Sequence, residues 1–308
     1  MTTRTGFRVG LLFAVYGAIG FGGEYLTGLL AQDHAPGDAP VRIGTEGDAD
    51  VGVALERELA TAVRARQSRD CAYAVEREVA IPVSDARLLS IDAGSGELVV
   101  EGRAGQSEVL AVGRVCASHE EYLEDLRLSV ERVGSEIVLS AHYPESRSWS
   151  GRSTARIDLE VSMPLGMALD IDDSSGSMEV FASGDLRVED SSGSILVVGA
   201  NGSVRIEDSS GELEIRDVAG DVEVSDGSGE IDVRDVQGTV RVRDGSGGID
   251  VAEVDQDVII EGDGSGGIDV RNVGGSLLVE RDGSGGIRYG DIEGPVDIPA
   301  DKLRRGGR

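Results

Sequence analysis

Residues 226–243 read Asp-Gly-Ser-Gly-Glu-Ile-Asp-Val-Arg-Asp-Val-Gln-Gly-Thr-Val-Arg-Val-Arg. The stretch holds an Asp-x-Ser-Gly corner and two triplets in which apolar and polar residues alternate. Copies of it recur every 17–19 residues along the second half of the chain. The seven copies start at Asp173, Asp190, Asp208, Asp226, Asp244, Asp263 and Asp282. A short fixed period of this kind indicates a stacked repeat architecture.

Four apolar positions recur in each copy when its Asp is counted as position 1. Positions 6 and 8 belong to a first strand, and positions 15 and 17 belong to a second. Side chains alternate between the two faces of a strand, so each triplet has an apolar face that it cannot bury alone. Parallel pairing of each strand with the same strand of the next copy would bury all four columns. We therefore expect an all-β chain built as a parallel β-solenoid of 17–19-residue coils.

A β-sandwich of antiparallel hairpins is the alternative architecture, because it also uses short strands and glycine turns. Seven copies in near-constant register favour the solenoid. Glycine recurs at position 13, where we expect a turn that needs a positive φ, and Gln256 is the one interruption. Residues 90–100, with Ser95-Gly96, read as an early and degraded copy.

The seven corner aspartates predict a structural turn ladder. Each carboxylate is expected to accept backbone N–H groups from its own turn, as in an Asx turn. Cations along the column are the alternative, since like charges about 4.8 Å apart repel by roughly 1 kcal/mol in water. The repeat departs from the Gly-Asp-rich calcium-binding β-rolls, because Arg271 falls where their unit has an apolar residue. We expect no metal ion and no cofactor.

Catalysis is not expected in the repeats. A catalytic site needs distinct groups that converge at one place. Here the same serines and aspartates recur in every copy, and the three histidines all precede the repeats. A carboxylate-based, glycan-active β-helix enzyme is the alternative.

The first half of the chain predicts export. Arg4 and Arg8 precede an apolar run that extends to residue 31 and is interrupted by Glu24. Residues 1–31 are therefore expected to be a signal peptide or an uncleaved signal anchor, and both alternatives stay open. A buried N-terminal helix of a cytosolic protein is the third reading. Export would place the β domain in the periplasm, at the cell surface or outside a membrane anchor.

The remaining boundaries follow from composition and periodicity. Residues 32–50 are expected to be a linker and 51–68 a short amphipathic helix. The solenoid domain is expected over 73–299, with irregular coils over 73–172 and regular repeats over 173–299. Residues 300–308 are expected to be a disordered basic tail.

Two cysteines, Cys71 and Cys116, are candidates for a disulfide if the domain is exported, and two unrelated thiols are the alternative.

Net charge and outward side chains limit the partners. The net charge of −28 argues against nucleic acid or anionic lipid as a partner of the folded part, so membrane contact is expected through the N-terminal segment alone. Ile259 and Leu278 are apolar at the outward position 16, where earlier copies carry charged residues. They predict a patch for a partner or for self-association, unless a C-terminal segment covers them. Trp149, the one Trp, lies in a Ser-Arg loop and is the other candidate interaction residue.

Three features resemble a bacterial domain family of unknown function that is called "putative adhesin". They are the strand 160–166 ending in Pro-Leu-Gly, the Ser-Gly corners, and the alternation Gly-x-Ile-x-Val…Gly-x-Val-x-Val. The resemblance covers about Val79 to Ile298. It implies a right-handed parallel β-solenoid on an envelope protein, and it transfers no catalytic or binding residues. We therefore expect a non-enzymatic, adhesin-like binding or scaffolding domain with a protein or glycan partner. A structural or sensing module of an envelope-stress system is the alternative.

Overall fold

The computed structural model describes residues 71–143 and 155–302. The expected signal segment, linker and amphipathic helix lie outside the described residues, and so do Trp149 and residues 303–308. Among the described residues, no helix has the length and apolar character needed to cross a membrane. Apart from one short 3-10 helix, η1 (Glu120–Glu124), the elements in these two ranges are β-strands.

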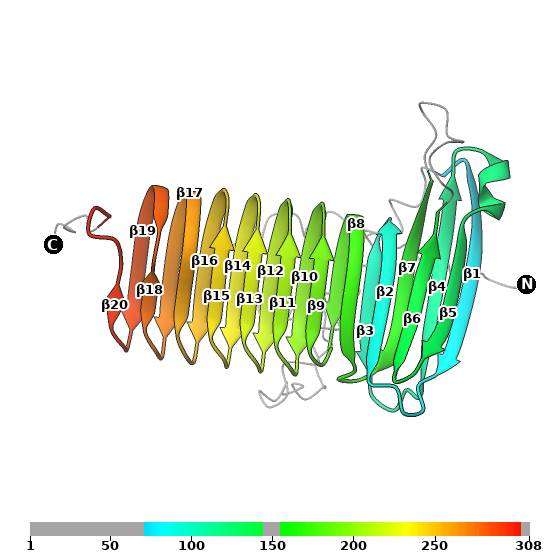
Figure 1. Cartoon of the computed structure of the whole chain (residues 1–308), viewed down its shortest axis with the longest axis horizontal. Helices are drawn as coiled ribbons and strands as arrows, with labels where there is room; N and C mark the ends of the chain where they lie inside the picture. The colour runs from blue at the N-terminus through cyan, green and yellow to red at the C-terminus, as the bar shows by residue number, and fades with distance from the viewer. Residues whose placement is uncertain (1–70, 144–154, 303–308) are drawn as a thin grey trace, which may run out of the picture. The chain divides into compact units, whose positions relative to one another are not determined.

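The regular repeats form a parallel β-solenoid of about seven turns (Figure 1). Each coil supplies two strand segments, which are continuous through the Ser-Gly corner in β8 and β17. The strands are β8 (Ala168–Phe181), β9 (Leu186–Asp190), β10 (Gly193–Ala200), β11 (Val204–Asp208), β12 (Gly211–Val218), β13 (Val222–Asp226), β14 (Gly229–Val236), β15 (Val240–Asp244), β16 (Gly247–Val254), β17 (Val258–Val273), β18 (Leu277–Val279), β19 (Asp282–Ile292) and β20 (Val296–Asp297).

Like residues stack on like residues from coil to coil. In the pair β10–β12 the register places Ile195 beside Leu213, and in the pair β11–β13 it places Asp208 beside Asp226. The side chains of the four predicted apolar columns are almost fully buried in the middle coils. The expected parallel solenoid is therefore confirmed, and the β-sandwich is excluded for these residues.

The N-terminal part combines coil-like and antiparallel pairing. β2 (Leu88–Ser95) and β3 (Leu98–Arg103) pair in parallel with β8, with Leu98 beside Met178. The other strands here are β1 (Tyr73–Pro82), β4 (Glu108–Ala117), β5 (Arg127–Val133), β6 (Glu136–His142) and β7 (Ala155–Pro164). The pairs β1–β4, β4–β7 and β5–β6 are antiparallel. β6 and β7 pair in parallel with β2 and β3, so these four strands continue the coil-like stacking before β8, and their buried side chains belong to the same core.

The core has two inward columns that the repeat pattern did not predict. One is position 11, occupied by Ala200, Val218, Val236, Val254 and Val273, where a turn was expected. The residue before it adopts a left-handed conformation, as Asp217 (φ 58°) and Asp235 (φ 56°) do. That conformation reverses the chain's alternation and turns the next side chain inward. The other unpredicted column is position 1, the aspartate itself.

Glycine recurs at two positions for different reasons, which corrects the expectation for position 13. The position-13 glycines are not among the residues of positive φ; a Cβ atom at Gly238 would lie 2.4 Å from the Gly220 carbonyl oxygen, so close approach of the coils favours glycine there, although the fifth copy has Gln256. The positive φ occurs instead at position 4, in the Ser-Gly corner. Gly266 there has a φ of 153°, and its Cβ would lie 1.4 Å from the Gly247 oxygen.

Replacing Gly266 by Ala should destabilise the solenoid strongly, because the new Cβ would overlap the backbone of the previous coil. We expect a loss of about 3 kcal/mol or more in the free energy of unfolding, measured by urea denaturation followed by circular dichroism. Gly267→Ala is the matched control, since a Cβ there meets nothing within 4 Å. It should change stability by less than about 0.5 kcal/mol. Equal losses in the two variants would contradict the close-approach explanation.

Candidate functional site

The aspartate column lies inside the solenoid and not on its surface. Each Asp continues the inward alternation of its strand, and the six residues from Asp173 to Asp263 are 3–7% exposed. In the middle coils one carboxylate oxygen accepts the N–H of the Ser two residues later, at 3.2 Å for Asp226–Ser228 and 3.1 Å for Asp244–Ser246. This is the hydrogen bond that an Asx turn requires.

The second carboxylate oxygen of these residues has no hydrogen-bond partner and is shielded from solvent. Burial, together with repulsion from the neighbouring Asp190, raises the pKa of Asp173 to about 7. Burial likewise raises the pKa of Asp244 to about 6, with added repulsion from Asp226 and Asp263. The described residues contain no group of three or more His, Cys, Asp or Glu side chains placed to hold a metal ion. The buried carboxyl groups of the column therefore favour the protonated, neutral form over the charged carboxylate.

One cation meets the column, at its C-terminal end. Lys302 Nζ lies 3.0 Å from Asp282 Oδ2 and donates to the Gly283 carbonyl oxygen at 2.9 Å. The two side chains are only 14% and 1% exposed. Lys302, which lies past the boundary at 299 expected from the sequence, is thus the counterion of the last corner.

The column predicts that stability decreases as the pH rises. The folded chain holds these protons more tightly than the unfolded chain, so their stabilising contribution is complete below the ordinary aspartate pKa of 3.8. It is lost as the pH rises through about 6 to 7, the raised pKa values of Asp244 and Asp173. Asp244→Asn keeps an uncharged acceptor at all pH values. Between about pH 4 and pH 8 it should gain about 2 kcal/mol relative to the wild type, measured by urea unfolding.

Asp255→Asn is the control, because Asp255 is exposed on the same coil. Its stability difference from the wild type should stay constant over this pH range. Parallel pH profiles for Asp244→Asn and the wild type would show that the buried carboxyl does not hold its proton.

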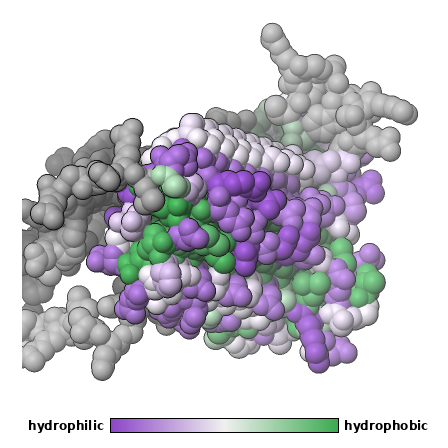
Figure 2. Space-filling view, turned by 60° about the vertical axis from the view of Figure 1, so that its left-hand side comes forward, coloured by the Kyte–Doolittle hydropathy of each residue, from purple (hydrophilic) through white to green (hydrophobic). Residues whose placement is uncertain are grey.

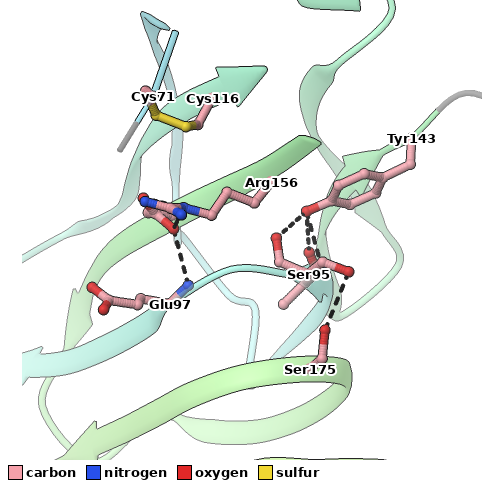
Figure 3. Close-up of polar contacts among 9 residues, drawn as sticks. Cys71, Ser95, Glu97, Cys116, Tyr143, Arg156 and Ser175 are labelled. Carbon is pink, nitrogen blue, oxygen red and sulfur yellow. Dashed lines mark hydrogen bonds and ion pairs between the residues drawn. A yellow bond between two sulfur atoms is a disulfide. The ribbon is translucent and has the colours of Figure 1, made fainter. Parts of the chain in front are cut away.

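A second feature lies where the repeat begins. A hollow of about 690 Å³ separates the Ser-Gly corners of the first coils from the ends of β4 and β7. Its lining comes from residues 71–72, 95–97, 116–118, 155–156, 158, 175–177 and 193–194. We call this hollow the turn groove. Figure 3 shows part of its lining, with the side chains of Arg156 and Glu97 on one side and Ser95 and Ser175 on the other.

Hydrogen bonds fix the polar groups of the turn groove. Arg156 Nε lies 3.0 Å from Asp158 Oδ1, and the same oxygen accepts the Glu97 N–H at 3.2 Å. The Ser175 hydroxyl lies 3.4 Å from the Ser95 hydroxyl. These contacts join β7 to the first two corners, so the groove has a rigid floor.

Tyr143 ends the corner ladder on the N-terminal side (Figure 3). In later coils the corner Gly donates to the carbonyl of the corner Ser in the next coil, as Gly211 does to Ser228 at 3.0 Å. The Ser95 carbonyl has no earlier coil, and it accepts the Tyr143 hydroxyl at 2.5 Å, while the Ser95 N–H donates to that hydroxyl at 3.0 Å. Burial raises the pKa of Tyr143 to about 12, so the hydroxyl stays protonated and can donate.

Cys71 and Cys116 are joined by a disulfide at the rim of the turn groove, with a Cα–Cα distance of 5.5 Å (Figure 3). The bond connects Cys71, two residues before β1, to β4 and closes a loop with a sequence separation of 45 residues. Cys116 is paired in register with Arg156 of β7, so the bond lies directly beside the ion pair of the groove.

Reduction of this disulfide should lower stability by about 2–4 kcal/mol, because the unfolded chain regains the freedom of the closed loop. The measurement is thermal unfolding with and without a thiol reductant, beside the intact mass of the purified protein. A Cys71→Ser/Cys116→Ser double variant is the control, and its melting temperature should be the same with and without the reductant. Two titratable thiols in the non-reduced protein would contradict the bond.

The predicted interaction residues are placed differently from the turn groove. Ile259 and Leu278 are neighbours in register on β17 and β18, between Arg241 and Asp297, and both are half-buried. The apolar side chains left most exposed by the repeats are instead Tyr289 (47%) and Val296 (37%) of the last coil. Figure 2 shows a largely hydrophilic surface with an apolar patch toward the C-terminal coils and further apolar residues at the opposite side of the view.

Apart from the two cysteines and the Ser-Gly corners, sequence reasoning missed the turn groove residues. Arg156, Asp158 and Glu97 come from two separate segments that precede the regular repeats. Their only sequence signal is the degraded Ser-Gly copy at Ser95, which places one wall of the groove and leaves the others unassigned.

Comparison with known proteins gives structural likenesses only. No protein-family model and no curated sequence matches this chain. A "putative adhesin" from Bacteroides fragilis matches over 71% of this chain and 97% of its own, at 11% identity and a TM-score of 0.42. A "putative lipid binding protein" from Parabacteroides distasonis covers 74% and 98%, at 17% identity and a TM-score of 0.41. A "putative cell adhesion protein" from Clostridium sporogenes covers 72% and 100%, at 14% identity and a TM-score of 0.29.

Proposed function

We propose that this chain is an exported, non-enzymatic β-solenoid domain of the cell envelope that binds or scaffolds a partner through the turn groove. The observation that carries the proposal is the contrast between the repeats and the groove. Every regular coil offers the same short corners, whereas the groove gathers unlike polar side chains from separate segments into one hollow. Specific recognition requires such a concave and varied surface. The likenesses to named adhesins carry none of this proposal.

Export is supported by the N-terminal apolar segment and by the disulfide, because disulfides form and persist in oxidising compartments. Signal peptide and signal anchor stay alternatives, and the right-handed sense of the coil and the two N-terminal helices stay predictions. Cell fractionation, followed by mass spectrometry of the mature N-terminus, tests both the compartment and the cleavage.

A binding role fits the groove better than a catalytic one. The Arg156 guanidinium is paired with Asp158, and Asp158 also accepts the Glu97 N–H, so these groups hold one another in a fixed arrangement. Hydrolysis by two carboxylates needs one raised and one ordinary pKa at the reacting centre. Most raised carboxyl pKa values of the regular coils belong to the column inside the solenoid, behind the corners that form the groove. The pKa of Asp235 is raised by a hydrogen bond with Glu253, and neither residue lines the groove.

The purified mature domain should cosediment with isolated envelopes of the source cells in a saturable way, without releasing soluble sugar from them. The measurement is the bound fraction against protein concentration, together with reducing ends in the supernatant. Domain unfolded by reduction and urea is the control, and it should bind without saturation or not at all. Absence of saturable binding would overturn the proposal, and steady release of reducing ends would favour the glycan-active enzyme. A deletion strain tests the alternative of an envelope-stress module. If that alternative holds, the strain should show unchanged cell adhesion and an altered envelope-stress response.

A further inference from the structure

The turn groove presents a surface rich in hydroxyl groups. Five serines contribute to its lining: Ser95, Ser118, Ser175, Ser177 and Ser194. A hydroxyl can donate one hydrogen bond and accept two, so a row of serines suits a ligand whose own groups both donate and accept. The polyhydroxyl face of a sugar is such a ligand.

The charge of the groove disfavours an anionic ligand. Its only basic side chain, Arg156, is paired with Asp158, and Glu97 adds a further carboxylate. The chain as a whole carries a net charge of −28. A phosphate, a uronic acid or a nucleic acid would meet repulsion without a free counter-charge. A neutral ligand meets no such cost.

The apolar part of the groove is formed by small side chains. It comes from Ala72, Ala117, Ala155 and the disulfide, beside glycine backbone. Peptide recognition relies on pockets that bury large side chains, and these short side chains form none. Small apolar surfaces between hydroxyl groups instead match the mixed faces of a sugar ring.

Size and rigidity also fit a short glycan. The volume of about 690 Å³ lies within the range of about 300–1,000 Å³ found for small-molecule sites. The floor is held by hydrogen bonds between coils, Gly96 to Ser175 at 3.0 Å and Gly176 to Ser192 at 3.2 Å. A preformed floor lowers the entropy cost of binding a weakly held ligand.

We propose that the turn groove binds a neutral oligosaccharide. The inference rests on the proposed function and adds the class of ligand and the residues that contact it. The ligand would lie across the corners of the first coils, with its hydroxyl groups against Ser175, Ser177 and Ser194 and its edge against the Arg156–Asp158 pair.

The test uses a substitution that the fold already accepts. Position 5 of the repeat is Ser177 and Ser194 in the groove, but Glu212 and Glu230 in the next two coils. A Ser177→Glu/Ser194→Glu variant should therefore fold normally while filling the groove with bulk and negative charge. The probes are neutral hexasaccharides of β-linked glucose, of N-acetylglucosamine and of mannose, measured by isothermal titration calorimetry. We expect at least one probe to bind, and the variant to bind it at least about tenfold more weakly at an unchanged melting temperature.

Glu212→Ser is the matched control, because Glu212 lies one coil beyond the groove, and it should leave the affinity unchanged. In one outcome the wild type binds no neutral probe, while its saturable envelope binding is abolished by protease treatment of the envelopes and survives periodate oxidation. This result would overturn the saccharide inference alone. Loss of saturable envelope binding altogether would overturn the proposed function as well. Equal binding by the wild type and the double variant would place the sugar elsewhere and overturn the assignment to this groove.

Discussion

The structure depends on the contact between successive Ser-Gly corners. The corner glycine donates its N–H to the corner serine of the next coil, from Gly96–Ser175 at 3.0 Å to Gly229–Ser246 at 2.9 Å. A Cβ atom on any of these glycines beyond the first would lie 1.4–1.7 Å from the previous corner's carbonyl oxygen. The coils therefore cannot move apart without losing the hydrogen bond, and they cannot accept a side chain at that position. This constraint sets one register for every column of the core.

That register explains why an aspartate can occupy the interior. The strand leading into each corner alternates, and its last inward residue must lie beside the corner's own N–H groups. A carboxyl satisfies them with one oxygen and leaves the other in the core, at the energetic cost of a buried polar atom. Protonation of the carboxyl reduces the cost of burying it. At the last coil, where no further corner aspartate follows Asp282, the ammonium group of Lys302 offsets this cost. The corner is thus strong because of its backbone geometry and sensitive to pH because of its side chain.

The repeat pattern predicted the coils well, because parallel stacking makes one copy's environment equal to the next. Ile231 and Val233 could be placed in the core from their alternation alone. Position 11 could not, since Val236 follows a left-handed Asp235 and breaks the period of two. Asp226 was placed at a corner correctly, but its inward direction depends on the strand before it. The turn groove escaped prediction because Arg156 and Asp158 lie on β7, which pairs with β3 and β4 outside the regular repeats and leaves no periodic signal.

The two ends of the corner ladder are closed by unlike groups, Tyr143 at the first corner and Lys302 at the last. Neither group contacts the coils between them in the described contacts. The middle of the solenoid is therefore modular: one complete coil, cut from corner to corner, has the same neighbours above and below as any other. Duplication or loss of a coil during evolution would change the reach of the domain in whole steps while leaving the groove and both end closures intact. In such a protein the length is a heritable variable that is separate from recognition.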